Sequence, residues 1–233
     1  MVKLIERYNG QLSFMIVYWF ICLVMFLRTF SFLYIMLAWN VFLAMLPLLF
    51  AVKVRYAIER GIFGQTVFWA IFWLLFFPNS VYMITDFIHI SNDKLLRIIE
   101  ADRYSQVGDV MYSTDIAAWA KLLVIGIGFL FAILVGLESL YLIEQGIKNK
   151  VSKLFSRLGI LMVALLSGVG VYIGRFLRFN SWDVFLKPFH LLDQLCTGMD
   201  GFAVQFIAAF AVFIIVCYSL YRAFRSKPTA ETI

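Results

Sequence analysis

Six long runs of apolar residues constrain the fold of this chain more than any other feature. The runs extend over residues 12–27, 30–52, 62–88, 116–143, 158–177 and 202–224. A bilayer core about 30 Å thick is crossed by a helix of roughly 20 apolar residues, and only a helix satisfies its own backbone polar groups in hydrocarbon. The sequence therefore predicts an all-α polytopic membrane protein with about six transmembrane helices.

The composition leaves no room for a separate soluble domain. Hydrophobic residues make up 63% of the 233 residues and charged residues only 15%, which is far from the usage of soluble domains. We therefore expect residues 1–225 to form a single transmembrane helical domain whose first partner is the lipid bilayer. The polar residues 226–233 are expected to be a disordered tail.

The connections between the runs differ in charge. Lys and Arg concentrate before the first run, after the second and the fourth, and at the end of the sixth, whereas Asp and Glu concentrate in the other connections. The positive-inside rule then predicts that both termini are cytoplasmic. The net charge of +6 arises mostly from this bias, so it gives no support to a nucleic-acid partner.

In this topology the two longest connections both face outward and are amphipathic. In the first, residues 91–114, the segment Asp93–Glu100 is expected to form a short amphipathic helix with Asp93 as its N-cap. In the second, residues 179–201, aromatic residues stand beside charges, which is typical of a segment lying in the membrane interface. Together these loops are expected to form a lid over the outer ends of the helices.

The third run becomes polar before it ends. Asn79, Tyr82, Asp86 and His89 fall on one face at helical spacing. Polar side chains at the end of a membrane span are costly unless they pair or serve a function. This face is therefore a candidate ligand-binding surface.

The fifth run ends in a second polar segment, which contains Arg175 and Arg178. Arginine binds phosphate or carboxylate groups bidentately, so an anionic lipid or lipid-linked ligand is expected. The predicted ligand-binding residues are Asn79, Tyr82, Asp86, His89, Arg175, Arg178, Asn180 and Asp183. The alternative is that Arg175 pairs with Asp86 or Asp115 and only joins helices.

Asp86 and His89 are also the candidate catalytic residues, since their spacing of three places both side chains on one helical face. With His190 they are candidate Zn²⁺ or Mn²⁺ ligands. Two histidines so far apart are not a ligand pattern, so no metal site is predicted. The sequence identifies no nucleophile, and the need for a cofactor stays open.

Two motifs carry a resemblance to a known family. Phe77–His89 and Tyr172–Asp183 resemble the two signatures of bacterial integral membrane proteins grouped as domain of unknown function 1361. This chain departs from them at Ser80 and Val81, where the family often has Ala-Pro, and at Phe179, where it has Trp. The resemblance implies a location in the bacterial plasma (inner) membrane and no particular activity.

Three functions fit these observations. The first is binding or transport of an anionic or lipid-head-group ligand in an outward-facing pocket. The second is a membrane-embedded enzyme that acts on a lipid-linked cell-envelope precursor, with Asp86 and His89 as the reacting residues. The third is a non-catalytic subunit whose outward loops dock another membrane protein.

Overall fold

A computed structural model of the chain describes residues 8–91, 95–99 and 109–225. Within these residues, six helices are long and apolar enough to cross a membrane, so the predicted all-α polytopic fold is confirmed. They are α2 (Asn9–Thr29), α3 (Leu33–Glu59), α4 (Phe63–Tyr82) with its continuation η1 (Met83–Ile90), α5 (Ile116–Ile147), α6 (Lys153–Tyr172) with its continuation η2 (Ile173–Leu177), and α9 (Gly201–Arg225). The predicted tail lies outside the described residues. That residues 1–225 form one domain stays a prediction.

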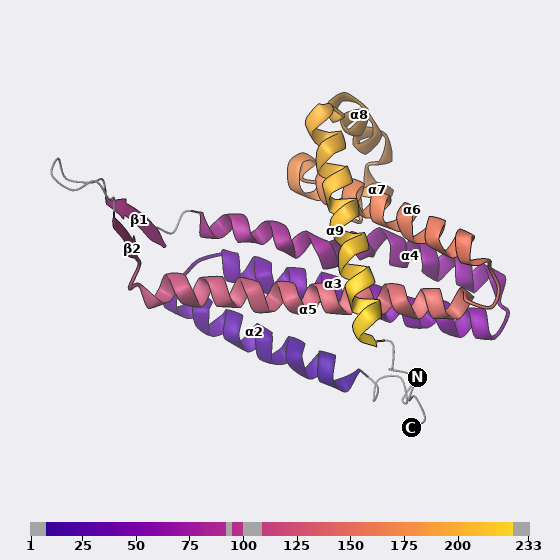
Figure 1. The fold of residues 1–233 in the computed structure, drawn as a ribbon, viewed down its shortest axis with the longest axis horizontal. Helices are drawn as coiled ribbons and strands as arrows, with labels where there is room; N and C mark the ends of the chain where they lie inside the picture. The colour runs from indigo at the N-terminus through magenta and orange to yellow at the C-terminus, as the bar shows by residue number, and fades with distance from the viewer. Residues whose placement is uncertain (1–7, 92–94, 100–108, 226–233) are drawn as a thin grey trace, which may run out of the picture.

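Helix α3 lies at the centre of the bundle. It packs against α2, α4 and α5, while α6 packs on α4 and α9 packs on α6. In Figure 1 the helices α2 to α6 follow the long axis of the molecule, and α9 runs across α5. Leu37, Val41, Ala44 and Leu48, spaced three or four residues apart in α3, are fully buried. This spacing keeps one face of α3 in the core throughout its length.

Following the predicted topology, we call the end of the bundle where η1 ends at Ile90 and α5 begins at Ile116 the outer end. We call the end where α3 ends at Glu59 and α6 begins at Lys153 the inner end. Around the bundle, large apolar side chains such as Phe20 and Phe63 are exposed. A bilayer would cover such side chains, whereas in water they would cause aggregation.

The expected amphipathic helix over Asp93–Glu100 is wrong. Leu96–Ile99 forms a strand, β1, which pairs antiparallel with β2 (Asp109–Tyr112), and Leu96 lies opposite Tyr112. Asp93 and Glu100 themselves lie outside the described residues. A short apolar run does not distinguish a helix from a strand by periodicity, and the β-branched residues here favour the strand.

The second long connection contains two short helices, α7 (Asp183–Leu186) and α8 (Pro188–Gly198). Pro188 occupies the first turn of α8, where its missing N–H costs no helical hydrogen bond. Figure 1 shows the β1–β2 hairpin beyond one end of the bundle and α7 and α8 beside α6 and α9. The described parts of the two connections therefore lie apart from one another, and a common lid stays a prediction.

Candidate functional site

The two polar motifs lie where α4 and α6 lose regular α-helical geometry. Helix α4 continues as the 3₁₀-helix η1, and α6 continues as the π-helical turn η2. Runs of 3₁₀-helix longer than four residues are uncommon, and π-helical turns are frequently found at functional sites. Both deviations occur at the outer end, so they mark the same region of the bundle.

The sequence explains the change in α4. Pro78 lies inside the helix, where its ring displaces one helical hydrogen bond. Two side chains donate hydrogen bonds to backbone carbonyl groups of this segment. The Asn79 side-chain amide donates to the carbonyl of Phe76 at 3.0 Å, and the Thr85 hydroxyl donates to the carbonyl of Tyr82 at 2.8 Å. Such local bonds compete with the regular helical pattern.

Helices α4 and α6 approach closely at these motifs. A Cβ atom added to Gly170 would lie 2.6 Å from Cγ of Pro78, and one added to Gly174 would lie 3.3 Å from the ring of Tyr82. The first distance is shorter than any real contact of this type. The absence of side chains on these two glycines therefore lets the two motifs touch.

A cavity of about 530 Å³ lies between α3, α4, α6 and the segment that follows η2. Most of its lining is apolar, and its polar lining residues are Asn40, Asn79, Tyr82, Asn180 and Ser181. Trp182 stands against Trp39 of α3, with ring centroids 6.4 Å apart, and both line the cavity. Cavities of roughly 300–1,000 Å³ with a few polar groups are typical of small-molecule sites.

Hydrogen bonds hold the segment after η2 in place. The Asn79 side chain donates to the Ser181 hydroxyl at 3.1 Å, which joins α4 to this segment. Asp183 accepts from the backbone N–H of Asn180 at 2.7 Å. Asp183 does not line the cavity. Its contact with Asn180 orders the turn that carries two of the polar lining residues.

Asp86 is fully buried behind the cavity. The Asn40 amide, which lines the cavity, donates to Oδ2 of Asp86 at 2.8 Å. Oδ1 of Asp86 and Nε2 of His89 are buried and have no hydrogen-bond partner among the described residues. A buried polar atom without a partner costs free energy, so it commonly indicates a functional role.

Arg175 stands on η2. Among the described residues no ion pair joins Arg175 to Asp86 or Asp115. The alternative prediction, that Arg175 pairs with one of them and only joins helices, therefore has no direct contact in its support.

The structure separates the predicted site residues into two groups. Asn79, Tyr82 and Asn180 line the cavity. The others do not line it, namely Asp86, His89, Arg175, Arg178 and Asp183. Two of the polar residues that line the cavity, Asn40 and Ser181, are missing from the predicted set. Asn40 is recognisable as a lone amide in an apolar run, whereas nothing in the sequence distinguishes Ser181 from any other serine.

The candidate metal ligands do not assemble into a set. Within the ranges that the structure describes, no three His, Cys, Asp or Glu side chains come together. His190 lies instead against the ring of Phe179, with ring centroids 5.5 Å apart.

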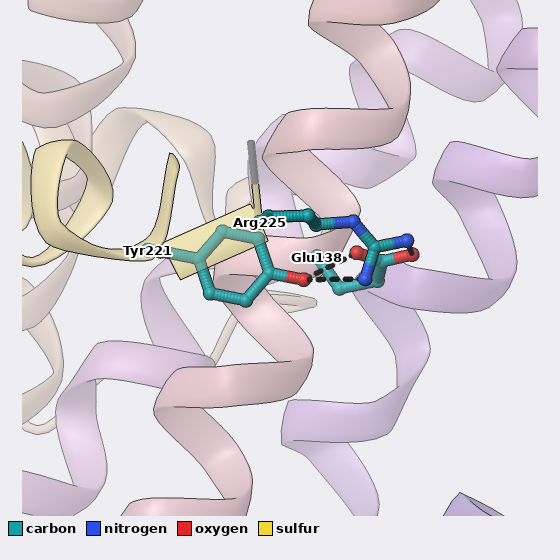
Figure 2. Close-up of polar contacts among 3 residues, drawn as sticks. All are labelled: Glu138, Tyr221 and Arg225. Carbon is teal, nitrogen blue, oxygen red and sulfur yellow. Dashed lines mark hydrogen bonds and ion pairs between the residues drawn. The ribbon is translucent and has the colours of Figure 1, made fainter. Parts of the chain in front are cut away.

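A second polar cluster, absent from the prediction, lies in the inner half of the bundle. Figure 2 shows Glu138 of α5 between Tyr221 and Arg225 of α9. The Tyr221 hydroxyl donates to the Glu138 carboxylate at 2.5 Å, and the Arg225 guanidinium pairs with it at 3.1 Å. Glu138 stands inside the apolar run 116–143. A lone carboxylate in such a run is the signal that reveals this cluster.

The backbone of Arg178 gives a prediction at the outer site. Its φ of 59° lies in the left-handed region, which costs a residue with a side chain about 1–2 kcal/mol relative to glycine. We expect Arg178→Gly to raise the free energy of unfolding in detergent by about 1 kcal/mol, and Arg178→Ala to leave it nearly unchanged. Equal effects of the two substitutions would contradict a backbone origin.

Comparison with known proteins gives a family and no activity. A family model described as a protein of unknown function (DUF1361) matches residues 39–217. No curated protein and no solved structure matches the chain.

Proposed function

This chain belongs to the DUF1361 family of proteins of unknown function, and we propose that it binds the head-group end of a lipid or lipid-linked molecule. The binding site is the cavity between α3, α4 and α6. The chain is a multi-pass membrane protein.

The single observation that carries the proposal is the position of the cavity in the bundle. Trp39, Ile71 and Leu166 line it, and these residues of the membrane-spanning helices α3, α4 and α6 are 49%, 54% and 44% exposed. A bilayer around these helices would therefore border the cavity. A ligand with an apolar chain can reach it sideways from the bilayer, without crossing the polar outer surface.

The polar groups of the cavity support a head group at its outer side. Asn79, Tyr82 and Asn180 supply neutral hydrogen-bonding groups, and Arg175 follows the lining residue Gly174 in η2. An arginine near neutral donors and acceptors suits an anionic head group such as a phosphate or carboxylate. The apolar lining would then hold the first part of the ligand's hydrocarbon chain.

The orientation that we propose rests on charge. Lys148 and Lys150 stand in the connection between α5 and α6 at the inner end, Lys153 begins α6, and the Lys150 ammonium donates to the carbonyl of Ile58 at 2.9 Å. The positive-inside rule assigns this end to the cytoplasm, which supports cytoplasmic termini, whereas the proposed bacterial plasma-membrane location rests on the family resemblance. The cavity would then open toward the outer leaflet.

The two other functions have less support. Catalysis by Asp86 and His89 requires that they reach a substrate, but neither lines the cavity, and Asp86 is fully buried. A docking role for the first outward loop rests on residues 91–114, half of which lie outside the described residues. Ligand binding is therefore the better-supported proposal.

Filling the cavity tests this proposal. Val169 of α6 lines the cavity, whereas Leu161 of the same helix is exposed and does not line it. We expect native mass spectrometry of the purified protein to show a lipid-sized adduct that Val169→Trp lowers by about tenfold, equivalent to 1.4 kcal/mol of binding, and that Leu161→Trp retains. Arg175→Ala should remove the adduct selectively when its head group is anionic.

Two results would overturn the proposal. One is an adduct that survives Val169→Trp unchanged, which would place the bound lipid on the outer surface of the bundle. The other is the absence of any adduct from the wild-type protein, both as purified and after incubation with an extract of bacterial phospholipids and polyisoprenyl phosphates.

A further inference from the structure

By their packing, we divide the six long helices into two groups, called bodies below. Helices α6 and α9 make one of them, because α6 packs more on α9 than on α4, and a Cβ atom added to Gly168 of α6 would lie only 2.6 Å from the backbone carbonyl oxygen of Ile207 in α9. Backbones this close cannot slide past one another freely. Helices α2 to α5 make the other body, packed around α3. Figure 1 shows α9 running across α6 and α5 from its start beside α8.

At the inner end the two bodies are joined by polar contacts. We call these contacts the α5–α9 clamp, which consists of Glu138, Glu144, Tyr218, Tyr221, Arg222 and Arg225. The two carboxylates of α5 are bound in the same way, each by one tyrosine and one arginine of α9. Glu144 accepts from the Tyr218 hydroxyl at 2.5 Å and pairs with Arg222 at 3.0 Å, as Glu138 does with Tyr221 and Arg225.

Apolar packing between α5 and α9 is loose on both sides of the clamp. A groove of about 810 Å³ separates the two helices, and its lining includes Leu137 and Cys217. A further cavity of about 420 Å³ reaches the clamp from the side of α2 and α3, where Gln11 and Leu48 line it together with Glu138. Among the described residues, the clamp therefore supplies the hydrogen bonds and ion pairs that join α9 to α5 at this end.

The outer cavity lies between the same two bodies. Asn40 and Asn79 line it from the first body, and Val169 and Gly170 line it from the second. At its wall, Pro78 and Gly170 form the close approach of α4 and α6. A rotation of the α6–α9 body about this contact would narrow the outer cavity and separate α9 from α5 at the inner end.

We infer that the protein moves its ligand across the membrane by alternating access, with the α5–α9 clamp as the inner gate and the 420 Å³ cavity as the inner vestibule. The identity of the ligand rests on the proposed function above, but the motion of the two bodies does not. Rigid-body rocking of one bundle against another around a site is a common mechanism of membrane transporters.

The chemistry of the clamp suits a gate that opens to water. A carboxylate in the membrane interior is costly unless it is paired, so Glu138 and Arg225 hold the gate shut while lipid surrounds them. Once water reaches the two charges, their hydration offsets much of the free energy that is lost when the ion pair separates. An apolar seal would lack this compensation and would resist opening to water.

Cys217 offers a native probe of the gate, since it is half-buried in the groove between α5 and α9. Maleimides react with the thiolate form of cysteine, and a thiol ionises to the thiolate only where water reaches it. Cys196→Ser removes the exposed thiol, and peptide mapping distinguishes Cys217 from the buried Cys22. The measurement is the rate of modification by a membrane-impermeant maleimide, added separately to each face of membrane vesicles.

We expect Glu138→Gln to raise this rate at least about tenfold, from the inner face only, because loss of a hydrogen-bonded charge shifts an equilibrium by that factor or more. Tyr221→Phe, which removes only a hydroxyl, should raise it by a smaller factor with little risk to folding. The matched control is Glu59→Gln, which removes the exposed Arg55–Glu59 pair within α3 and leaves the two bodies joined.

An unchanged rate in a folded Glu138→Gln or Tyr221→Phe variant would overturn the proposal. So would an equal rise in Glu59→Gln, since that would indicate general loosening. If the Glu138→Gln variant fails to fold, the modification rate of the Tyr221→Phe variant alone decides the test. No ligand is needed for this test, so its outcome is independent of the adduct experiment with Val169→Trp, and either proposal can fail without the other.

Discussion

Asn40→Leu is expected to lower the free energy of unfolding by about 3 kcal/mol, the scale observed when one partner of a buried charged group is removed. Asp86 is fully buried, and Asn40 supplies the one side-chain hydrogen bond recorded for it among the described residues. Leucine has a volume similar to that of asparagine, so the expected loss of stability comes from the missing hydrogen bond more than from a new cavity. The measurement is equilibrium unfolding of the purified protein in mixed detergent micelles.

A double substitution separates this cause from general damage to α3. In Asn40→Leu with Asp86→Leu, no carboxylate is left without a partner, so the total loss should be smaller than the sum of the two single losses. Asn149→Leu, in the exposed connection after α5, serves as the control and should change stability by less than about 0.5 kcal/mol. Additive losses would show that Asn40 does not act through Asp86.

Gly168→Val is expected to destabilise the protein by about 3 kcal/mol or to prevent its accumulation in the membrane. Its Cβ would meet the carbonyl oxygen of Ile207 at 2.6 Å, and a backbone atom cannot turn aside as a side chain can. Helices α6 and α9 would have to separate, and overpacking that displaces backbone typically costs 1–3 kcal/mol or more. Expression level and unfolding in detergent both report this effect.

The matched control lies in the same helix. Gly159 has nothing within 4 Å of an added Cβ, so Gly159→Val should change the stability by less than about 1 kcal/mol. Similar losses at the two positions would mean that valine itself disfavours α6, and the close approach of α6 and α9 would not be the cause.

Helical spacing predicts only part of the cavity lining. Asn79 and Tyr82 line the cavity as their helical spacing predicts, but Asp86 and His89 lie outside its lining. The reason is the change of helix type at Met83, because a 3₁₀-helix has 3.0 residues per turn where the α-helix has 3.6. Residues before and after Met83 therefore do not share the face that a continuous α-helix would give them.

The sequence by itself determined the membrane class and the six long helices. Each apolar run is long enough to span hydrocarbon, and a chain in hydrocarbon must satisfy its backbone locally, so neither result depends on what the runs touch. The helix type of each motif and the strand at Leu96–Ile99 depended on competing local preferences that periodicity does not resolve.

Only the tertiary structure decided which polar groups meet. Asn40 and Asp86 are 46 residues apart, and Glu138 and Arg225 are 87 residues apart, yet each pair is in direct contact. In a membrane the apolar surfaces of the helices differ little from lipid, so hydrophobicity selects no particular partner for a helix. The pairing comes from close packing at small residues and from buried polar contacts, which exist only once the helices have assembled.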